Sequence, residues 1–248
     1  MVASSMPEHD PTAYGSAIAD RYDALYGDRE AETTIEAVVG LAQGGPVLEM
    51  GIGTGRVALP LRERGLCVAG IEGSPEMVER LRAKPGGREI EVAVGDFAAT
   101  RLAARDFGLV LLNLNAIFAL PDQDAQVRCF ANAAAHLRPG GRFVVEAMVL
   151  EPALHREGVA VAPRTFGEGH VELQASRYDA AAQRITRRLV LLGAGGVQVV
   201  SVEDRYAWPG ELDLMARMGG LALEHRWGAW EGTPFTSRSD RHVSVYRR

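Results

Sequence analysis

Three glycines at alternate positions follow an acidic residue at the end of a short apolar run. Glu49 closes the run, and Gly51, Gly53 and Gly55 come directly before an apolar helical stretch. Glycines in this pattern let the backbone turn tightly and approach a ligand without Cβ atoms in the way. The free N–H groups and the dipole at the start of the following helix favour an anion. The segment therefore predicts a nucleotide-like binding site.

Two common nucleotide motifs do not fit this segment. A dinucleotide fingerprint needs a third glycine, and the positions where it would fall hold Arg56 and Ala58. A Walker loop needs a Lys-Ser/Thr pair, which is also missing from the segment. An NAD-dependent oxidoreductase is therefore disfavoured, and a glycine-rich turn without a ligand remains the structural alternative.

Two further acidic residues follow later strands of the pattern. Glu72 ends the next apolar run, where a carboxylate can accept hydrogen bonds from both ribose hydroxyls of an adenosine. Asp96 and Phe97 follow Gly95 after a third run, where Asp96 would accept from the adenine amine and Phe97 would contact the ring. A solvated loop acid and an ordinary Gly-Asp turn are the respective alternatives.

Together these motifs resemble class I S-adenosylmethionine (SAM)-dependent methyltransferases over residues 46–149. The order is Glu-x-Gly-x-Gly-x-Gly, the acid at 72, Gly-Asp-Phe, and Leu-Arg-Pro-Gly-Gly at 137–141. The resemblance implies that Glu49 holds the methionine ammonium, that N–H groups around Gly53 to Arg56 face its carboxylate, and that SAM is the cofactor. The implied SAM-binding residues are Tyr22, Glu49, Gly51, Gly53, Gly55, Arg56, Glu72, Gly73, Met77, Asp96, Phe97, Asn113 and Leu114.

The N-terminal segment is similar to the lid of small-molecule methyltransferases, among them amino-sugar and lincosamide N-methyltransferases. Tyr14 and the run from Ile18 to Tyr26 carry this resemblance. It implies that Tyr22 contacts the SAM carboxylate and that Tyr14 faces the acceptor as a catalytic and substrate-binding residue. Packing of both rings in the core is the alternative.

The acceptor is less clearly specified. Asn113-Leu114-Asn115-Ala116 departs from the Asn/Asp-Pro-Pro-Tyr signature of enzymes that methylate amides and base amines, and neither converging carboxylates nor spaced histidines predict a metal. A small-molecule amine is slightly favoured, because an amine needs mainly positioning whereas a hydroxyl also benefits from a base. O-methylation and a non-catalytic SAM-binding module remain open.

Several side chains are candidates for the acceptor side. The candidate general bases are His155, His170 and Glu146. His155 is the predicted catalytic residue among them, and Glu146 is also predicted to bind the substrate. Phe118 is expected to line the acceptor pocket. The remaining large aromatics are expected mostly in the core: Tyr206, Trp208, Trp230 and Phe235.

The alternation of apolar runs and amphipathic stretches predicts an α/β fold. We expect a doubly wound, seven-stranded, mostly parallel sheet with an antiparallel β insertion after strand five. Pro60 is expected to kink the helix after the glycines. The expected parts are a helical lid at 1–45, a SAM-binding core at 46–149, an insertion forming the acceptor-pocket wall at 150–207, and the last helix and strands at 208–248.

Composition and charge limit the kinds of molecule that the chain is expected to bind. The chain has 248 residues and a formal net charge of −5 without a Lys/Arg block, which argues against nucleic acid or an anionic membrane as the main partner. No signal peptide or membrane span is evident, so a cytoplasmic protein is expected. Cys67 and Cys129 are expected to be reduced and buried. A homo-oligomer remains open.

Overall fold

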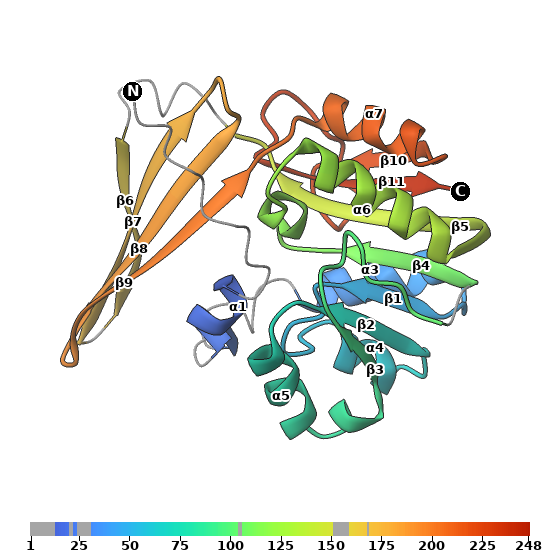
Figure 1. The fold of residues 1–248 in the computed structure, drawn as a ribbon, viewed down its shortest axis with the longest axis horizontal. Coiled ribbons are helices and arrows are strands. Elements are labelled where there is room, and N and C mark those ends of the chain that lie inside the picture. The colour runs from blue at the N-terminus through green and yellow to red at the C-terminus, as the bar shows by residue number, and fades with distance from the viewer. Residues whose placement is uncertain (1–12, 20–21, 24–30, 104–105, 151–158, 168) are drawn as a thin grey trace.

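The computed structural model describes residues 13–19, 22–23, 31–103, 106–150, 159–167 and 169–248, and its centre is a seven-stranded sheet (Figure 1). The strand order is β10-β11-β5-β4-β1-β2-β3. Strands β1 to β5 run parallel, and β11 is antiparallel to both of its neighbours. The expected fold class is confirmed. The strands are β1 Val47–Met50, β2 Val68–Glu72, β3 Glu91–Val94, β4 Phe107–Leu112, β5 Leu137–Met148, β10 Ala222–Trp227 and β11 Arg241–Arg247.

The sheet is covered on both faces because its central strands alternate their side chains between two cores. Leu48 and Val110 face one core, whereas Val47 and Leu109 face the other. The first core is completed by α6 (Gln123–His136), α7 (Pro209–Met218) and the short helix η3 (Ala116–Ala119), and the second by α3 (Ala31–Ala42), α4 (Ala58–Glu63) and α5 (Pro75–Ala83). Another short helix, η2, spans Gly87–Glu89.

The strand order predicts a ligand-binding crevice at the carboxyl ends of β1 and β4. From β1 the chain continues outward through β2 and β3, and it then returns to β4 on the other side of β1. In open α/β sheets ligands bind at such a reversal, because the loops from the two sides diverge there. The glycine turn after β1 lies at this point.

A second, four-stranded antiparallel sheet follows β5 and stands beside the main sheet (Figure 1). Its strands are β6 (Val159–Gly167), β7 (His170–Asp179), β8 (Arg184–Gly193) and β9 (Gly196–Arg205). The sequence predicted the last three, but not β6. Pro163 and a register shift interrupt β6, which hides its alternation. Helix α1 (Ala13–Ile18) contacts both β9 and α5.

Two local predictions were wrong. Pro60 was expected to kink the helix after the glycines, but α4 begins only at Ala58, so the proline lies in its first turn, where an N–H has no partner within the helix. Cys67 is exposed rather than buried, since it precedes β2 instead of lying in it; Cys129 is buried, and both thiols are free. No helix in the described ranges is long and apolar enough to cross a bilayer.

Candidate functional site

The turn after β1 depends on its three glycines. Gly51, Gly53 and Gly55 have φ angles of 73°, 55° and 82°, the left-handed region that side chains disfavour. A Cβ on Gly51 would lie 3.7 Å from the Ala116 Cβ and 4.0 Å from the Phe97 ring. The turn therefore leaves a bare backbone surface at the crevice.

Glu72, at the carboxyl end of β2, holds this turn. Its Oε2 accepts a hydrogen bond from the Gly53 N–H at 2.8 Å, and its Oε1 accepts one from the Ser74 N–H at 2.9 Å. Burial raises the pKa of the carboxyl, and the backbone donors of Ser74, Gly53 and Gly73 oppose this. A carboxylate offers about four acceptor positions, so capacity remains for the hydroxyls of a ligand.

Glu49 lies fully buried at the end of β1, and one of its oxygens is unsatisfied. Oε2 has no hydrogen-bond partner in the described part of the chain. Burial raises the pKa of Glu49 to about 8, against the nearby Arg56 guanidinium, which lowers it. A buried acceptor without a partner is costly. A cationic donor from a ligand would relieve that cost.

The turn after β4 has an unusual backbone that β5 supports. Leu114 and Asn115 have φ angles of 47° and 63°, which residues other than glycine rarely adopt. The Leu114 N–H donates to Asn113 Oδ1 at 2.8 Å and to Glu146 Oε2 at 3.1 Å, and Asn115 Oδ1 accepts from the Met148 N–H at 2.6 Å. Such strain is maintained when surrounding bonds fix it, and it is frequent at functional sites.

Asn113 presents a second unsatisfied polar atom. The residue is buried, and its Nδ2 lacks a partner among the residues described. Asn113 follows β4, and Glu49 ends the neighbouring strand β1. A free donor and a free acceptor thus lie on adjacent strand ends, which suits a ligand that carries both kinds of group.

Asp96 and Phe97 form the next side of the crevice. Asp96 Oδ1 accepts from the Ala98 N–H at 2.8 Å, and the Phe97 carbonyl accepts from Asn132 Nδ2 at 2.8 Å. These bonds fix the loop after β3, with the Phe97 ring near Gly51. The loop is therefore positioned beside the glycine turn, as the predicted adenine contact would require.

The N-terminal segment is fastened to the glycine turn by residues that the sequence analysis missed. Asp23 Oδ1 accepts from Thr54 Oγ1 at 2.5 Å, and Asp23 Oδ2 pairs with Lys84 Nζ at 2.8 Å. Lys84 also donates to the Thr54 carbonyl at 2.8 Å. The Tyr22 ring is half-buried against the cluster around Met77 and lies near Gly53. No local pattern signals these contacts, because the partners are far apart in sequence.

A pocket of about 400 Å³ opens beside the turn after β4. Its lining includes Arg56, Leu114, Asn115, Glu146 and Arg241. Glu146 is buried, which raises the pKa of its carboxyl, whereas the Leu114 N–H, Arg241, Trp230 and Arg56 oppose the shift. The pocket therefore combines a buried carboxyl with two guanidinium groups next to the crevice.

Phe118 and His170, which were also predicted for the acceptor side, do not line this pocket. Phe118 lies in the hydrophobic core and lines neither pocket, because η3 turns its ring inward. Trp230 and Tyr206 are core residues, as expected, but Trp208 and Phe235 line a second pocket. His170 is exposed at the start of β7. His155 and the Tyr14 side chain lie outside the described residues, although the Tyr14 backbone belongs to α1.

These features fit SAM. The glycine turn offers room and backbone donors, Glu72 has free acceptor capacity, and Glu49 and Asn113 carry the unsatisfied atoms that an α-amino acid end would satisfy. Within the residues described, no cluster of His, Cys, Asp and Glu is arranged to hold a metal ion.

Comparisons with known proteins agree with this fit. Residues 47–141 match a family described as "Methyltransferase domain". The chain is 26% identical to the cypemycin N-terminal methyltransferase of Streptomyces sp over 245 residues, which cover 96% of this chain and 99% of that protein.

Solved structures give the same result. The CcbJ methyltransferase from Streptomyces caelestis is 38% identical, with a TM-score of 0.88 over 96% of this chain and 98% of that one. The sugar N-methyltransferase KedS8 from a Streptoalloteichus species is 23% identical, with a TM-score of 0.69 over 100% and 99% of the two chains, and at that identity it supports the fold alone.

Proposed function

Because this chain belongs to the class I SAM-dependent methyltransferases that act on small molecules in specialised metabolism, we propose that it methylates an amine of its acceptor. Two observations support an amine. A relative that aligns over nearly the whole chain is, by its name, an N-terminal methyltransferase. The pocket beside the crevice also holds a buried carboxyl, Glu146, that can interact with an amine.

In this proposal each strand end binds a different part of the cofactor. Glu72 binds the ribose, Asp96 and Phe97 the adenine, and Glu49 with the Asn113–Leu114 turn the ammonium. The N–H groups from Gly53 to Arg56 face the carboxylate, and Tyr22 covers it from the N-terminal segment. SAM, when bound, supplies a methyl group activated by its sulfonium.

Glu146 carries the proposal on the acceptor side. At neutral pH an aliphatic amine is mostly protonated, and the proton must leave before the nitrogen lone pair can react. A carboxylate whose pKa is raised by burial is a better base than an exposed one. The nitrogen proton would pass first to Glu146 and from there to solvent through the pocket. The freed lone pair would then take the methyl group, with the N–C bond forming as the S–C bond of bound SAM breaks to leave S-adenosylhomocysteine. Tyr14 and His155 remain predicted catalytic residues.

The experiment is a product screen with matched acceptors. Each amine is offered with SAM beside the analogue in which a hydroxyl replaces the amine, and products are identified by mass. The proposal expects methylated amines and little methylated hydroxyl. Preferential hydroxyl methylation would establish the O-methyltransferase instead. Binding of S-adenosylhomocysteine (SAH) without transfer to any acceptor would favour a non-catalytic module.

Glu146→Gln tests the base directly. The amide oxygen can still accept from the Leu114 N–H, so the turn is preserved while the base is lost. We expect a fall in kcat of roughly 10²–10⁴-fold, the usual contribution of general-base catalysis. SAH affinity should stay near the wild-type value. A pH–rate profile that keeps its wild-type acidic limb would contradict the role.

A further inference from the structure

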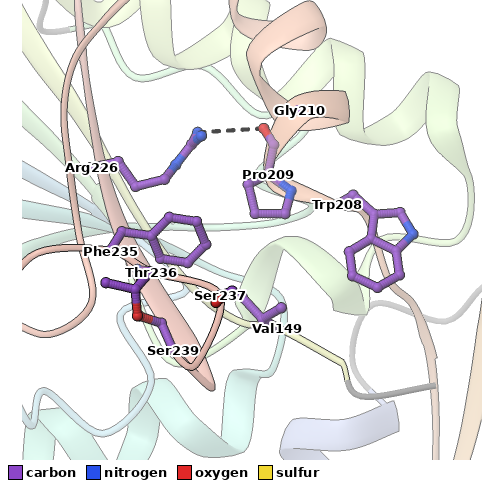
Figure 2. A pocket seen from close by; sticks show the side chains of 9 residues that line it. All are labelled: Val149, Trp208, Pro209, Gly210, Arg226, Phe235, Thr236, Ser237 and Ser239. Atoms are coloured by element: carbon purple, nitrogen blue, oxygen red, sulfur yellow. Dashed lines mark hydrogen bonds between the residues drawn. The ribbon is translucent and has the colours of Figure 1, made fainter. Parts of the chain in front are cut away.

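A second pocket, of about 590 Å³, lies between the first turn of α7, strand β10 and the loop that joins β10 to β11 (Figure 2). Figure 2 shows Trp208 and Pro209 on one side, with Arg226 and Phe235 opposite. The end of β10 and the start of β11 both lie at the carboxyl edge of the sheet, because β11 is antiparallel to β5. The pocket is therefore on the edge that carries the crevice.

The two pockets share a wall. Met148 and Asp240 line the pocket of Glu146, and their chain neighbours Val149 and Ser239 line the second pocket. The Val149 N–H donates to the Asp240 carbonyl at 2.7 Å, which joins the two segments. A molecule with one end at Glu146 would have to cross only this pair of segments to reach the second pocket.

The walls of the second pocket are mainly apolar. Trp208 remains 37% exposed, although indole surface is costly to leave in water. It lies across the pocket from Phe235, and Val149 and Pro209 complete the apolar surface. Aromatic and proline walls of this kind suit a ring.

The one charged side chain among the described residues that line the pocket, Arg226, is already paired. The Arg226 guanidinium donates to both oxygens of Asp213, at 2.5 and 3.2 Å, and lies 5.9 Å from the centre of the Phe235 ring. His242, which packs edge-on against Phe235, stays neutral because burial and Arg226 lower its pKa to about 4. Ser239 Oγ accepts from the Thr236 N–H at 2.9 Å and so stabilises the loop. The pocket therefore offers no uncompensated charge.

We propose that this second pocket binds an uncharged, ring-bearing part of the acceptor, remote from the methylated atom. Trp208 and Phe235 are then specificity-determining residues that select acceptors with an apolar ring. This inference rests on the proposed function, because it takes the amine to lie at Glu146.

The test separates ring binding from catalysis. Binding of 2-naphthol is measured by equilibrium dialysis to the wild-type chain, to Trp208→Ala and to Phe235→Ala. Leu214→Ala, on the outer face of α7, is the control. Each aromatic truncation should weaken naphthol binding by about tenfold, which is the effect of losing one buried aromatic contact. SAH affinity and the melting temperature of each variant are measured in parallel.

A kinetic arm links the pocket to the acceptor. Phenylalkylamines of increasing chain length are compared with alkylamines of equal length, and KM should fall once the phenyl ring reaches the pocket. Trp208→Ala should remove that gain and leave kcat unchanged.

The inference is overturned if naphthol does not bind, if it binds all variants equally, or if the phenyl ring brings no gain. It is also overturned if Trp208→Ala changes only the oligomeric state, because a second copy would then occupy the pocket. Failure of every amine as an acceptor, with naphthol still bound at Trp208, would instead refute the proposed function.

Discussion

At the residue scale, Glu72 has two tasks, because it holds the glycine turn and has acceptor capacity left for a ribose. Replacing Glu72 with alanine should weaken SAH binding by about 1.5–3 kcal/mol, the value of a hydrogen bond to a charged group. Calorimetry checks this. Glu79→Ala, on the exposed side of α5, is the matched control. Glu72→Gln keeps one acceptor for the turn, and wild-type affinity in this variant would contradict the ribose role.

Glu49 predicts a pH dependence of cofactor binding. Its pKa is raised from 4.5 to about 8 in the folded chain, so it is protonated at neutral pH. An ammonium beside it favours the carboxylate, and SAH binding should therefore release a proton. Affinity should rise with pH up to about 8, by at most about tenfold per unit, and then level off.

The proton release is measured by calorimetry in buffers of different ionisation enthalpy. Glu49→Gln should abolish both the release and the pH dependence, whereas Glu36→Gln on α3 should keep them. The same shift lowers stability as the pH rises from 4.5 to about 8, because the unfolded chain loses this proton first. Affinity that is flat in pH for the wild-type chain would be inconsistent with an ammonium at Glu49.

Residue types predicted part of this site. Glycines and acidic residues at strand ends can be recognised from the local sequence, since only glycine readily adopts the φ angles of the turn. Phe118, which was expected to line the acceptor pocket, packs in the hydrophobic core, and an aromatic residue in a strand–helix loop has no local pattern that distinguishes a core position from a pocket position. Asp23 and Lys84 were missed for a related reason: 61 positions of sequence separate a contact that only the fold creates.

At the element scale, the contact of Asp23 with Thr54 and Lys84 holds the N-terminal segment on the glycine turn. Lys84→Met removes the ion pair and the bond to the Thr54 carbonyl. Asp23 is nearly half exposed, so solvent screening limits the effect to about 0.2–1 kcal/mol. SAH affinity should fall by up to about fivefold. Arg88→Met is the control, and an unchanged affinity in Lys84→Met would exclude a role for this contact.

The second sheet depends on a buried polar anchor where β9 meets the core. Arg205 donates to Gln126, Gln183 and Glu211, and Gln126 in turn donates to the Arg205 carbonyl at 2.8 Å. Arg205→Met removes the donor to the buried Gln126 Oε1 and the cation beside Glu211, which keeps its bonds from Gln123 and Gln183. The free energy of unfolding should fall by about 1–3 kcal/mol, the cost of a buried polar group that loses its partner.

Thermal and urea unfolding measure that loss. The control is Arg188→Met, an exposed arginine on β8. Equal stability of Arg205→Met and the wild-type chain would show that the anchor is replaceable. The anchor also shows a limit of sequence patterns: the β segments of the insertion were visible as alternating runs, whereas its attachment to α6 depends on contacts across 79 positions.

At the scale of the whole molecule, the fold was predictable because strands and helices alternate regularly along the chain. Apolar runs alternate with helices from residue 46 onward, and the right-handed connections between parallel strands leave few topologies. Strand β6 escaped prediction because Pro163 interrupts its pattern. The second pocket escaped because its walls come from three separate segments, around residues 149, 208 and 235.

The same topology explains why the site is at one edge. Apart from Tyr22, the groups assigned to the cofactor lie at or after the ends of β1, β2, β3 and β4, and the carboxyl ends of parallel strands meet at one edge. The pocket of Glu146 and the second pocket, around Trp208 and Phe235, continue along that edge toward β5, β11 and β10. The cofactor, the reacting atom of the acceptor and the remote part of the acceptor would therefore lie side by side in the order of the strands along this edge.

A crystal structure of the chain with SAH tests the central claim most directly. The account predicts both ribose hydroxyls within hydrogen-bonding distance of Glu72 and the ammonium between Glu49 and the turn at Leu114. A complex in which SAH lies away from the glycine turn, or in which Glu72 contacts no part of the sugar, would contradict it.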